Sequence, residues 1–79
     1  MHYDPVLTFY HLVYIFLLDA ISSLSKAIQI LTEKGRFQSA AKHQEDIAGI
    51  YESELIDLEH SMQAYEVAAD WYAGESSTA

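Results

Sequence analysis

The sequence predicts an all-α protein, a helical-hairpin solenoid fragment of three to four helices. Three observations support this fold class. Apolar residues recur at steps of three and four in separate stretches, which is the spacing of amphipathic helices. Residues that begin and end helices lie between these stretches. The first and third stretches can also be aligned at a constant offset, which is typical of stacked repeats.

The N-terminal segment differs in composition from the rest of the chain. Asp4 and Pro5 are a good helix start, with Asp as N-cap and Pro at the first helical position. Residues 6–18 are almost wholly apolar and aromatic, and as a helix they would measure about 20 Å, less than the roughly 30 Å of a bilayer core. Their β-branched and aromatic content also suits a buried strand. We expect burial against a neighbouring helix or another chain, with an interfacial membrane anchor as the alternative.

A clearer helical pattern follows and ends at a glycine. The apolar positions have steps of four, three, four and three, and they are Leu17, Ile21, Leu24, Ile28 and Leu31. Gly35 comes after the last apolar turn, where a left-handed residue is wanted, and Lys34 suits the negative end of the helix dipole. The pattern leaves open whether residues 5–34 form one helix or two.

Two further helices are predicted. The second begins at Arg36 or Phe37 and fades at residues 54–56, and Asp57 is the expected N-cap of the third, which stops at Gly74 before a loop of residues 75–79. The expected buried face of the second helix is Phe37, Ala40, Ala41, Gln44, Ile47, Ala48 and Tyr51. That of the third is Leu58, Met62, Tyr65, Ala69 and Tyr72.

The first and third stretches match at an offset of 41 residues, which pairs Leu17 with Leu58 and Ala27 with Ala68. Together with the helix–turn–helix between them, this indicates a hairpin repeat of about 40 residues, in which each unit buries its face against its neighbours. A solenoid of this kind needs about three repeats, and this chain offers about one and a half, so we expect a fragment.

Composition excludes several classes of function. The chain has 79 residues, no cysteine and a formal net charge of -8, so it offers no disulfide, no thiolate metal site and no basic footprint for nucleic acid. The charge is uneven, because all four basic residues lie within residues 1–44, whereas residues 45–79 hold nine acidic residues and neither Lys nor Arg. The acids are expected to solvate exposed helix faces and to repel anionic lipid and phosphate.

No arrangement of residues indicates catalysis. His43 with Glu45 and Asp46, and Asp57 with His60, have a spacing seen in metal sites, but a helix-bundle metal centre needs further carboxylates. We therefore expect no catalytic residues, no metal and no cofactor, and we expect the aromatic residues Tyr51, Tyr65, Trp71 and Tyr72 to pack in the core. Arg36 and Lys42 are either solvated cations or a positive edge for an acidic partner.

Residues 19–77 resemble a known family. The segments KGRFQSAAKHQ (34–44), IAGIYESELIDLE (47–59) and AYEVAADWYAGES (64–76) are similar to the middle of the SNAP family, the soluble NSF attachment proteins. The resemblance implies a TPR-like array of helical hairpins that acts as an adaptor and not as an enzyme. It implies binding to the assembled SNARE four-helix bundle and presentation of that bundle to the NSF-type AAA ATPase, which disassembles it. The basic residues that match the family pattern are Arg36 and Lys42, the expected SNARE-binding residues.

The resemblance also sets the domain boundaries. Residues 1–18 do not resemble the family and form an apolar N-terminal segment, whereas residues 19–79 form the SNAP-like repeat fragment. The family's membrane-touching loop and its NSF-binding region have no counterpart here, so NSF contact is expected through missing regions. The implied location is cytoplasmic, peripheral to vesicle, Golgi or vacuolar-type membranes, in ER–Golgi and related vesicle transport. The alternative is a truncated, non-functional or membrane-associated small helical protein without SNARE activity.

Overall fold

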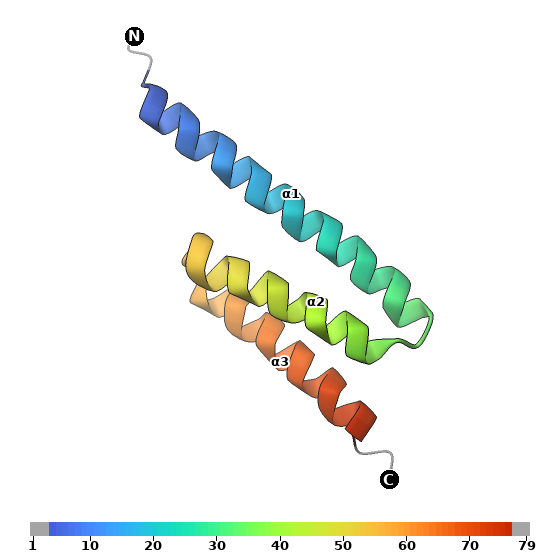
Figure 1. The fold of residues 1–79 in the computed structure, drawn as a ribbon. Coiled ribbons are helices and arrows are strands. Elements are labelled where there is room, and N and C mark those ends of the chain that lie inside the picture. Colours follow the sequence, from blue (N-terminus) through green and yellow to red (C-terminus); the bar gives the residue numbers. More distant parts are fainter. Residues whose placement is uncertain (1–3, 77–79) are drawn as a thin grey trace.

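A computed structural model describes residues 4–76, which form three α-helices and one π-helical turn (Figure 1). The elements in chain order are α1 (Pro5–Glu33), α2 (Phe37–Gly49), the π-helical turn η1 (Ile50–Glu54) and α3 (Leu58–Ser76). No strand occurs between residues 4 and 76. The predicted all-α fold class is therefore confirmed, and a buried strand in residues 6–18 is excluded.

Helix α1 is one continuous helix, which answers the question that the sequence left open. It begins as predicted, because the Asp4 carboxylate accepts a hydrogen bond of 2.9 Å from the Val6 backbone N–H and Pro5 occupies the first turn. Its 29 residues correspond to a length of about 43 Å. By length and composition it is the one described helix that is apolar enough to cross a membrane.

The chain reverses at Gly35, as predicted. Gly35 has a φ of 75°, in the left-handed region that a glycine adopts without strain. The Arg36 backbone N–H donates to the Leu31 carbonyl at 2.8 Å, and the Lys34 N–H donates to the Ile30 carbonyl at 3.2 Å. These bonds satisfy carbonyl groups at the end of α1 and fix the start of α2.

The second reversal lies where the sequence predicted that the second helix fades. Gly49 is followed by the π-helical turn, after which the Leu55 N–H donates to the Ile50 carbonyl at 3.0 Å and the Asp57 N–H to the Tyr51 carbonyl at 2.7 Å. Asp57 is the N-cap of α3, as predicted, because its carboxylate accepts from the His60 N–H at 3.2 Å.

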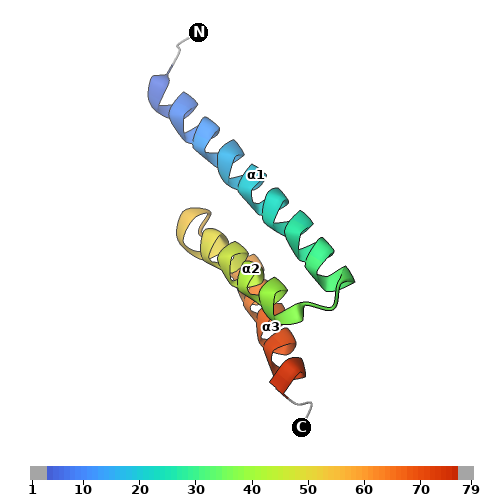
Figure 2. The same cartoon turned by 45° about the vertical axis from the view of Figure 1, so that its right-hand side comes forward.

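Helix α2 lies between α1 and α3 and is antiparallel to both (Figures 1 and 2). The backbones of α1 and α3 do not approach each other closely among the described residues. In both views the first half of α1 runs past the end of the α2–α3 hairpin and stands clear of it. The arrangement is elongated, with extents of 63 × 23 × 12 Å.

The core is small and consists mainly of alanine. Five of its seven buried apolar residues are alanines, and the full set is Ile28, Ala40, Ala41, Ile47, Ala48, Ala64 and Ala68. This confirms most of the face predicted for α2, of which Gln44 and Tyr51 are half-buried. Phe37 is 38% exposed, although its ring lies edge-to-face against Trp71 with the centroids 5.8 Å apart.

The buried face predicted for α3 is wrong. Leu58 and Met62 are each 62% exposed, Tyr65 is 42% exposed, Ala69 is exposed and Tyr72 is only half-buried. The residues that face α2 are instead Ser61, Ala64 and Ala68. Small side chains on both helices let the two backbones approach closely, and this close packing excludes the larger apolar residues from the interface.

The aromatic residues of the predicted core divide accordingly. Tyr51 and Trp71 pack against the core cluster, as expected, whereas Tyr65 lies at the surface. The predicted end of the third helix at Gly74 is also wrong, because α3 continues to Ser76. Gly74 does not have the positive φ that would end a helix. The expected loop therefore contains two helical residues, and residues 77–79 lie outside the described range.

The first half of α1 is not buried against a neighbouring helix, so that expectation is wrong within this chain. Apart from the half-buried Leu17, its large apolar side chains are exposed, up to 72% for Phe16. Helix α2 covers only the second half of α1, through Ile21, Leu24, Ile28 and Leu31.

Candidate functional site

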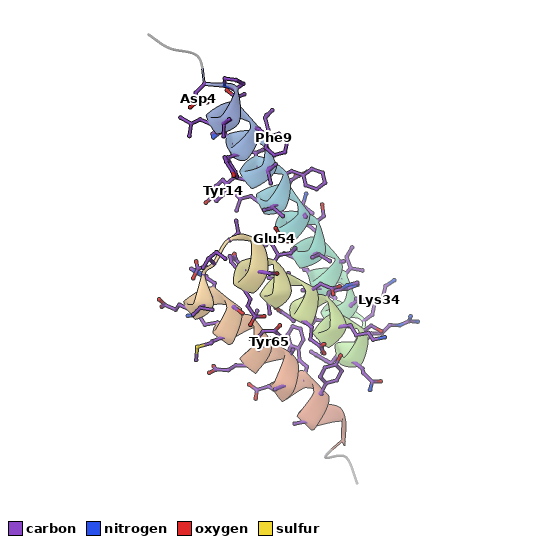
Figure 3. All side chains as sticks on the ribbon, turned by 60° about the vertical axis from the view of Figure 1, so that its left-hand side comes forward. Asp4, Phe9, Tyr14, Lys34, Glu54 and Tyr65 are labelled. Carbon is purple, nitrogen blue, oxygen red and sulfur yellow. The ribbon has the colours of Figure 1, made fainter. Side chains whose placement is uncertain are left out.

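The four basic residues lie in the second half of α1, in the α1–α2 turn and in α2. Lys26 is in α1, Lys34 and Arg36 flank Gly35 in the turn, and Lys42 is in α2. All four are exposed, and Figure 3 shows Lys34 projecting from the turn into open space. Neither Arg36 nor Lys42 forms an ion pair within residues 4–76. Their charges are therefore available to a partner.

Arg36 occupies the N-cap position of α2. Its carbonyl accepts the Ala40 N–H at 3.1 Å, and its side chain makes no capping hydrogen bond. A helix N-terminus carries a partial positive charge, so a cation at this place is electrostatically unfavourable for the helix. The preferred N-cap residues are Ser, Thr, Asp and Asn. Helix stability therefore gives no reason for an arginine here.

Lys42 borders a shallow depression between α2 and α3, which is also lined by Gln38, Ser39 and Tyr72. A hydrogen bond with Glu45, followed by burial and the negative charge of Glu45, raises the pKa of the Tyr72 hydroxyl. The Tyr72–Glu45 contact connects α2 to α3 beside Lys42. This contact has no local signal in the sequence, because only the helix packing brings the two residues together.

Arg36 and Lys42 do not lie on one stripe of α2. Six residues correspond to a rise of about 9 Å and a rotation of about 240°. The two cations are therefore near each other along the axis but point in different directions from it. A rod-shaped partner would need to cross the start of α2 to contact both.

The acidic–histidine pairs have structural roles. The His60 ring nitrogen Nδ1 lies 2.7 Å from Asp57 Oδ2, and the ring stacks on Tyr51 at a centroid distance of 5.1 Å. The hydrogen bond from the His60 backbone N–H, followed by that from its ring, lowers the pKa of Asp57. The His43 pair with Asp46 is longer, at 3.9 Å. No group of three potential metal ligands occurs within residues 4–76.

The same face of α3 carries a second tyrosine contact. The Tyr65 hydroxyl donates to the Glu52 carboxylate at 3.3 Å, which joins α3 to η1. Burial, followed by the negative charge of Glu52, raises the pKa of Tyr65. Two tyrosines of α3 thus reach acidic residues of the preceding segment, and no cation is involved in either contact.

Comparison with known proteins identifies a family. Residues 14–79 match the family model described as soluble NSF attachment protein, SNAP. The match includes the last residues of the segment 1–18, so the position of the expected boundary after residue 18 stays a prediction. No solved structure matches the chain.

Curated relatives from an animal, an amoeba and a yeast match the same part of the chain. The chain is 52% identical over 59 residues to the human alpha-soluble NSF attachment protein, which covers 75% of this chain and 20% of the relative. It is 44% identical over 61 residues to the alpha-soluble NSF attachment protein of Dictyostelium discoideum, which covers 77% of this chain and 21% of the relative. It is 38% identical over 61 residues to the vesicular-fusion protein SEC17 of Komagataella phaffii, which covers 77% of this chain and 20% of the relative. The chain thus spans about a fifth of the length of these relatives, and it belongs to the SNAP family of soluble NSF attachment proteins.

Proposed function

We propose that this chain forms part of a vesicle-fusion adaptor that binds the assembled SNARE four-helix bundle and works with an NSF-type ATPase in disassembling it. The observation that carries the proposal is the family match over residues 14–79, with relatives named as NSF attachment and vesicular-fusion proteins. The proposed adaptor has no enzymatic activity of its own. Its proposed location is cytoplasmic and peripheral to vesicle membranes.

The proposed contacts with the bundle are made by Arg36 and Lys42. Both are exposed and have no acidic partner within the described residues. The position of Arg36 at a helix N-terminus supports a binding role, because a cation there does not benefit the helix. Two separated cations provide electrostatic steering toward an acidic coiled coil more than a tight local fit.

The rest of the proposed function lies outside this chain. The relatives are about five times as long as the matched region, and contact with the ATPase is proposed to use their other regions. Residues 45–79 carry nine acidic residues and no basic one, so binding to an acidic bundle is assigned to Arg36, at the N-cap of α2, and Lys42, in the first part of α2.

A capture experiment tests the proposal. The 79-residue chain is incubated with an assembled SNARE bundle on beads, and the bound fraction is measured for the wild type and for Arg36→Glu with Lys42→Glu. The matched control is Lys26→Glu with Lys34→Glu, which makes the same change in net charge. We expect the first variant to bind about tenfold or more weakly and the control to bind nearly as the wild type does. Binding should also weaken with salt, because exposed charges are screened over about 10 Å at 0.1 M.

The design separates binding from folding. Arg36→Glu places an acid at the start of α2, which favours the helix, so a loss of binding would accompany unchanged or increased helicity. Circular dichroism provides that measurement. Equal losses in both charge-reversed variants would show a dependence on net charge alone, and binding that survives reversal of Arg36 and Lys42 would refute the assignment.

A further inference from the structure

The first half of α1 is exposed on more than one side. At about 100° per residue, Phe9, Leu12 and Phe16 lie on one side of the helix, and their exposed fractions are 64%, 60% and 72%. Tyr10 and Tyr14 lie on another side and are also exposed. Figure 3 shows Phe9 and Tyr14 leaving α1 in different directions.

This segment has no charged residue between Asp4 and Asp19. An ordinary surface helix has one apolar stripe and a charged opposite face. A helix that is apolar on several sides is found in a large core or in lipid. The α2–α3 hairpin does not provide such a core, because it packs only against the second half of α1.

We infer that the first half of α1 is a membrane anchor that lies in the surface of an uncharged lipid bilayer. Phe9, Leu12 and Phe16 enter the acyl chains, while the hydroxyl groups of Tyr10 and Tyr14 stay at the level of the headgroups. Amphipathic aromatic side chains favour this interfacial position. A second copy of the chain is a poorer occupant, because a neighbouring helix covers one stripe and leaves the other apolar side in water.

The flanking charges decide between an anchor in the surface and a membrane span. Asp4 and Asp19 are separated by about 22 Å along the helix, less than the roughly 30 Å of the hydrocarbon core. A complete crossing would bring Asp19 into the core. It would also strip Ile21 and Leu24 from their contacts with the core cluster. The helix therefore lies along one leaflet, and its second half stays packed against α2.

The charge of the chain selects the lipid. The formal net charge is -8, and no basic residue lies in the exposed segment, so anionic headgroups repel the protein. Binding driven by apolar burial does not depend on counterions and is insensitive to salt. This inference stands apart from the proposed SNARE contact, which depends on Arg36 and Lys42 and weakens with salt.

Vesicle flotation tests the inference. The full chain is mixed with phosphatidylcholine vesicles, and the floated fraction is measured for the wild type and for Phe9→Gln with Phe16→Gln. The matched control is Leu58→Gln with Met62→Gln, two residues of α3 with similar exposure. We expect the phenylalanine variant to partition about tenfold or more weakly. The control variant and Arg36→Glu with Lys42→Glu should float as the wild type does.

Depth is measured with lipids brominated on their acyl chains. Fluorescence of Phe16→Trp should be quenched on binding, and that of Met62→Trp should not, because Met62 lies on α3, outside the proposed anchor. Trp71 contributes the same background fluorescence to both proteins. Equal quenching in both, equal losses of flotation in both glutamine variants, or a requirement for phosphatidylserine would overturn the inference. An absence of flotation would also overturn it. If sedimentation then showed a dimer that Phe9→Gln with Phe16→Gln abolishes, a second copy of the chain would be the partner that covers the first half of α1.

Discussion

The α2–α3 interface and the first half of α1 use apolar residues in opposite ways. The interface buries small side chains, among them Ala48, Ala64 and Ala68, within a close helix contact. The first half of α1 is richer in large apolar residues, yet Phe16 and Leu7 remain exposed. Hydrophobic side chains therefore do not by themselves create a core. Burial requires a second surface whose shape permits close approach, and within residues 4–76 the α2–α3 hairpin provides it.

The difference also explains why the large apolar residues of α3 lie outside. A helix contact lined by alanine and serine brings the backbones too close for leucine or methionine to fit between them. Leu58 and Met62 are therefore left exposed on α3. The energy of the hairpin comes from close packing of small groups more than from the area of large ones.

The largest effect is expected from filling the α2–α3 interface. Ala48→Leu introduces three heavy atoms at a position with no exposure. We expect a loss of about 1–3 kcal/mol in the free energy of unfolding, because overpacking forces the helices apart or the side chain off its rotamer. Urea unfolding followed by circular dichroism measures this change.

The matched control makes the same substitution on the exposed side of α3. Ala69→Leu adds the same atoms where no helix packs, and we expect a change within about 0.5 kcal/mol. Similar losses at both positions would contradict the close contact between α2 and α3 and would favour the face originally predicted for α3.

Local chemistry made most of the fold predictable. The caps at Asp4 and Asp57 and the left-handed turn at Gly35 depend on neighbouring residues, and all three were predicted correctly. The face of α3 was not, because an apolar stripe was read as buried without knowledge of the partner surface. The spacing of an amphipathic helix is found at Leu58, Met62 and Ala69. The side chains small enough to pack against α2 are those of Ala64 and Ala68.

The candidate site was predictable only through the resemblance. Charge and exposure alone do not distinguish Arg36 and Lys42 from Lys26 and Lys34, which are also exposed. The structure adds one physical distinction, the unfavourable position of Arg36 at the start of α2. Tertiary contacts such as those of Tyr72 with Glu45 and Tyr65 with Glu52 join separate helices and leave no local signal in the sequence.

A smaller effect is expected at the second chain reversal. Ile56 has a φ of 52° and is 72% exposed, so a β-branched residue occupies the left-handed region with little compensating burial. Ile56→Gly removes the conflict between its side chain and the backbone, although glycine adds freedom to the unfolded chain. We expect a net gain of about 0.5–1 kcal/mol in the free energy of unfolding. Gly35→Ala, at a φ of 75°, is the complementary control and should destabilise the chain. A lower free energy of unfolding for Ile56→Gly would contradict backbone strain at Ile56.

The smallest effect is the pH dependence of the α3 N-cap. Hydrogen bonds from His60 lower the pKa of Asp57 below its ordinary value of 3.8. A lowered folded-state pKa contributes stability above about pH 3.8, and this contribution is lost as the pH falls through the folded value. The difference in melting temperature between the wild type and Asp57→Asn should therefore shrink between about pH 6 and about pH 3. Asp70→Asn makes the same charge change on the exposed surface of α3 and serves as the control for the loss of one negative charge. If the Asp57→Asn difference were constant with pH, the carboxylate would not stabilise the helix start through its charge, and the first turn of α3 would depend on its contacts with η1 instead.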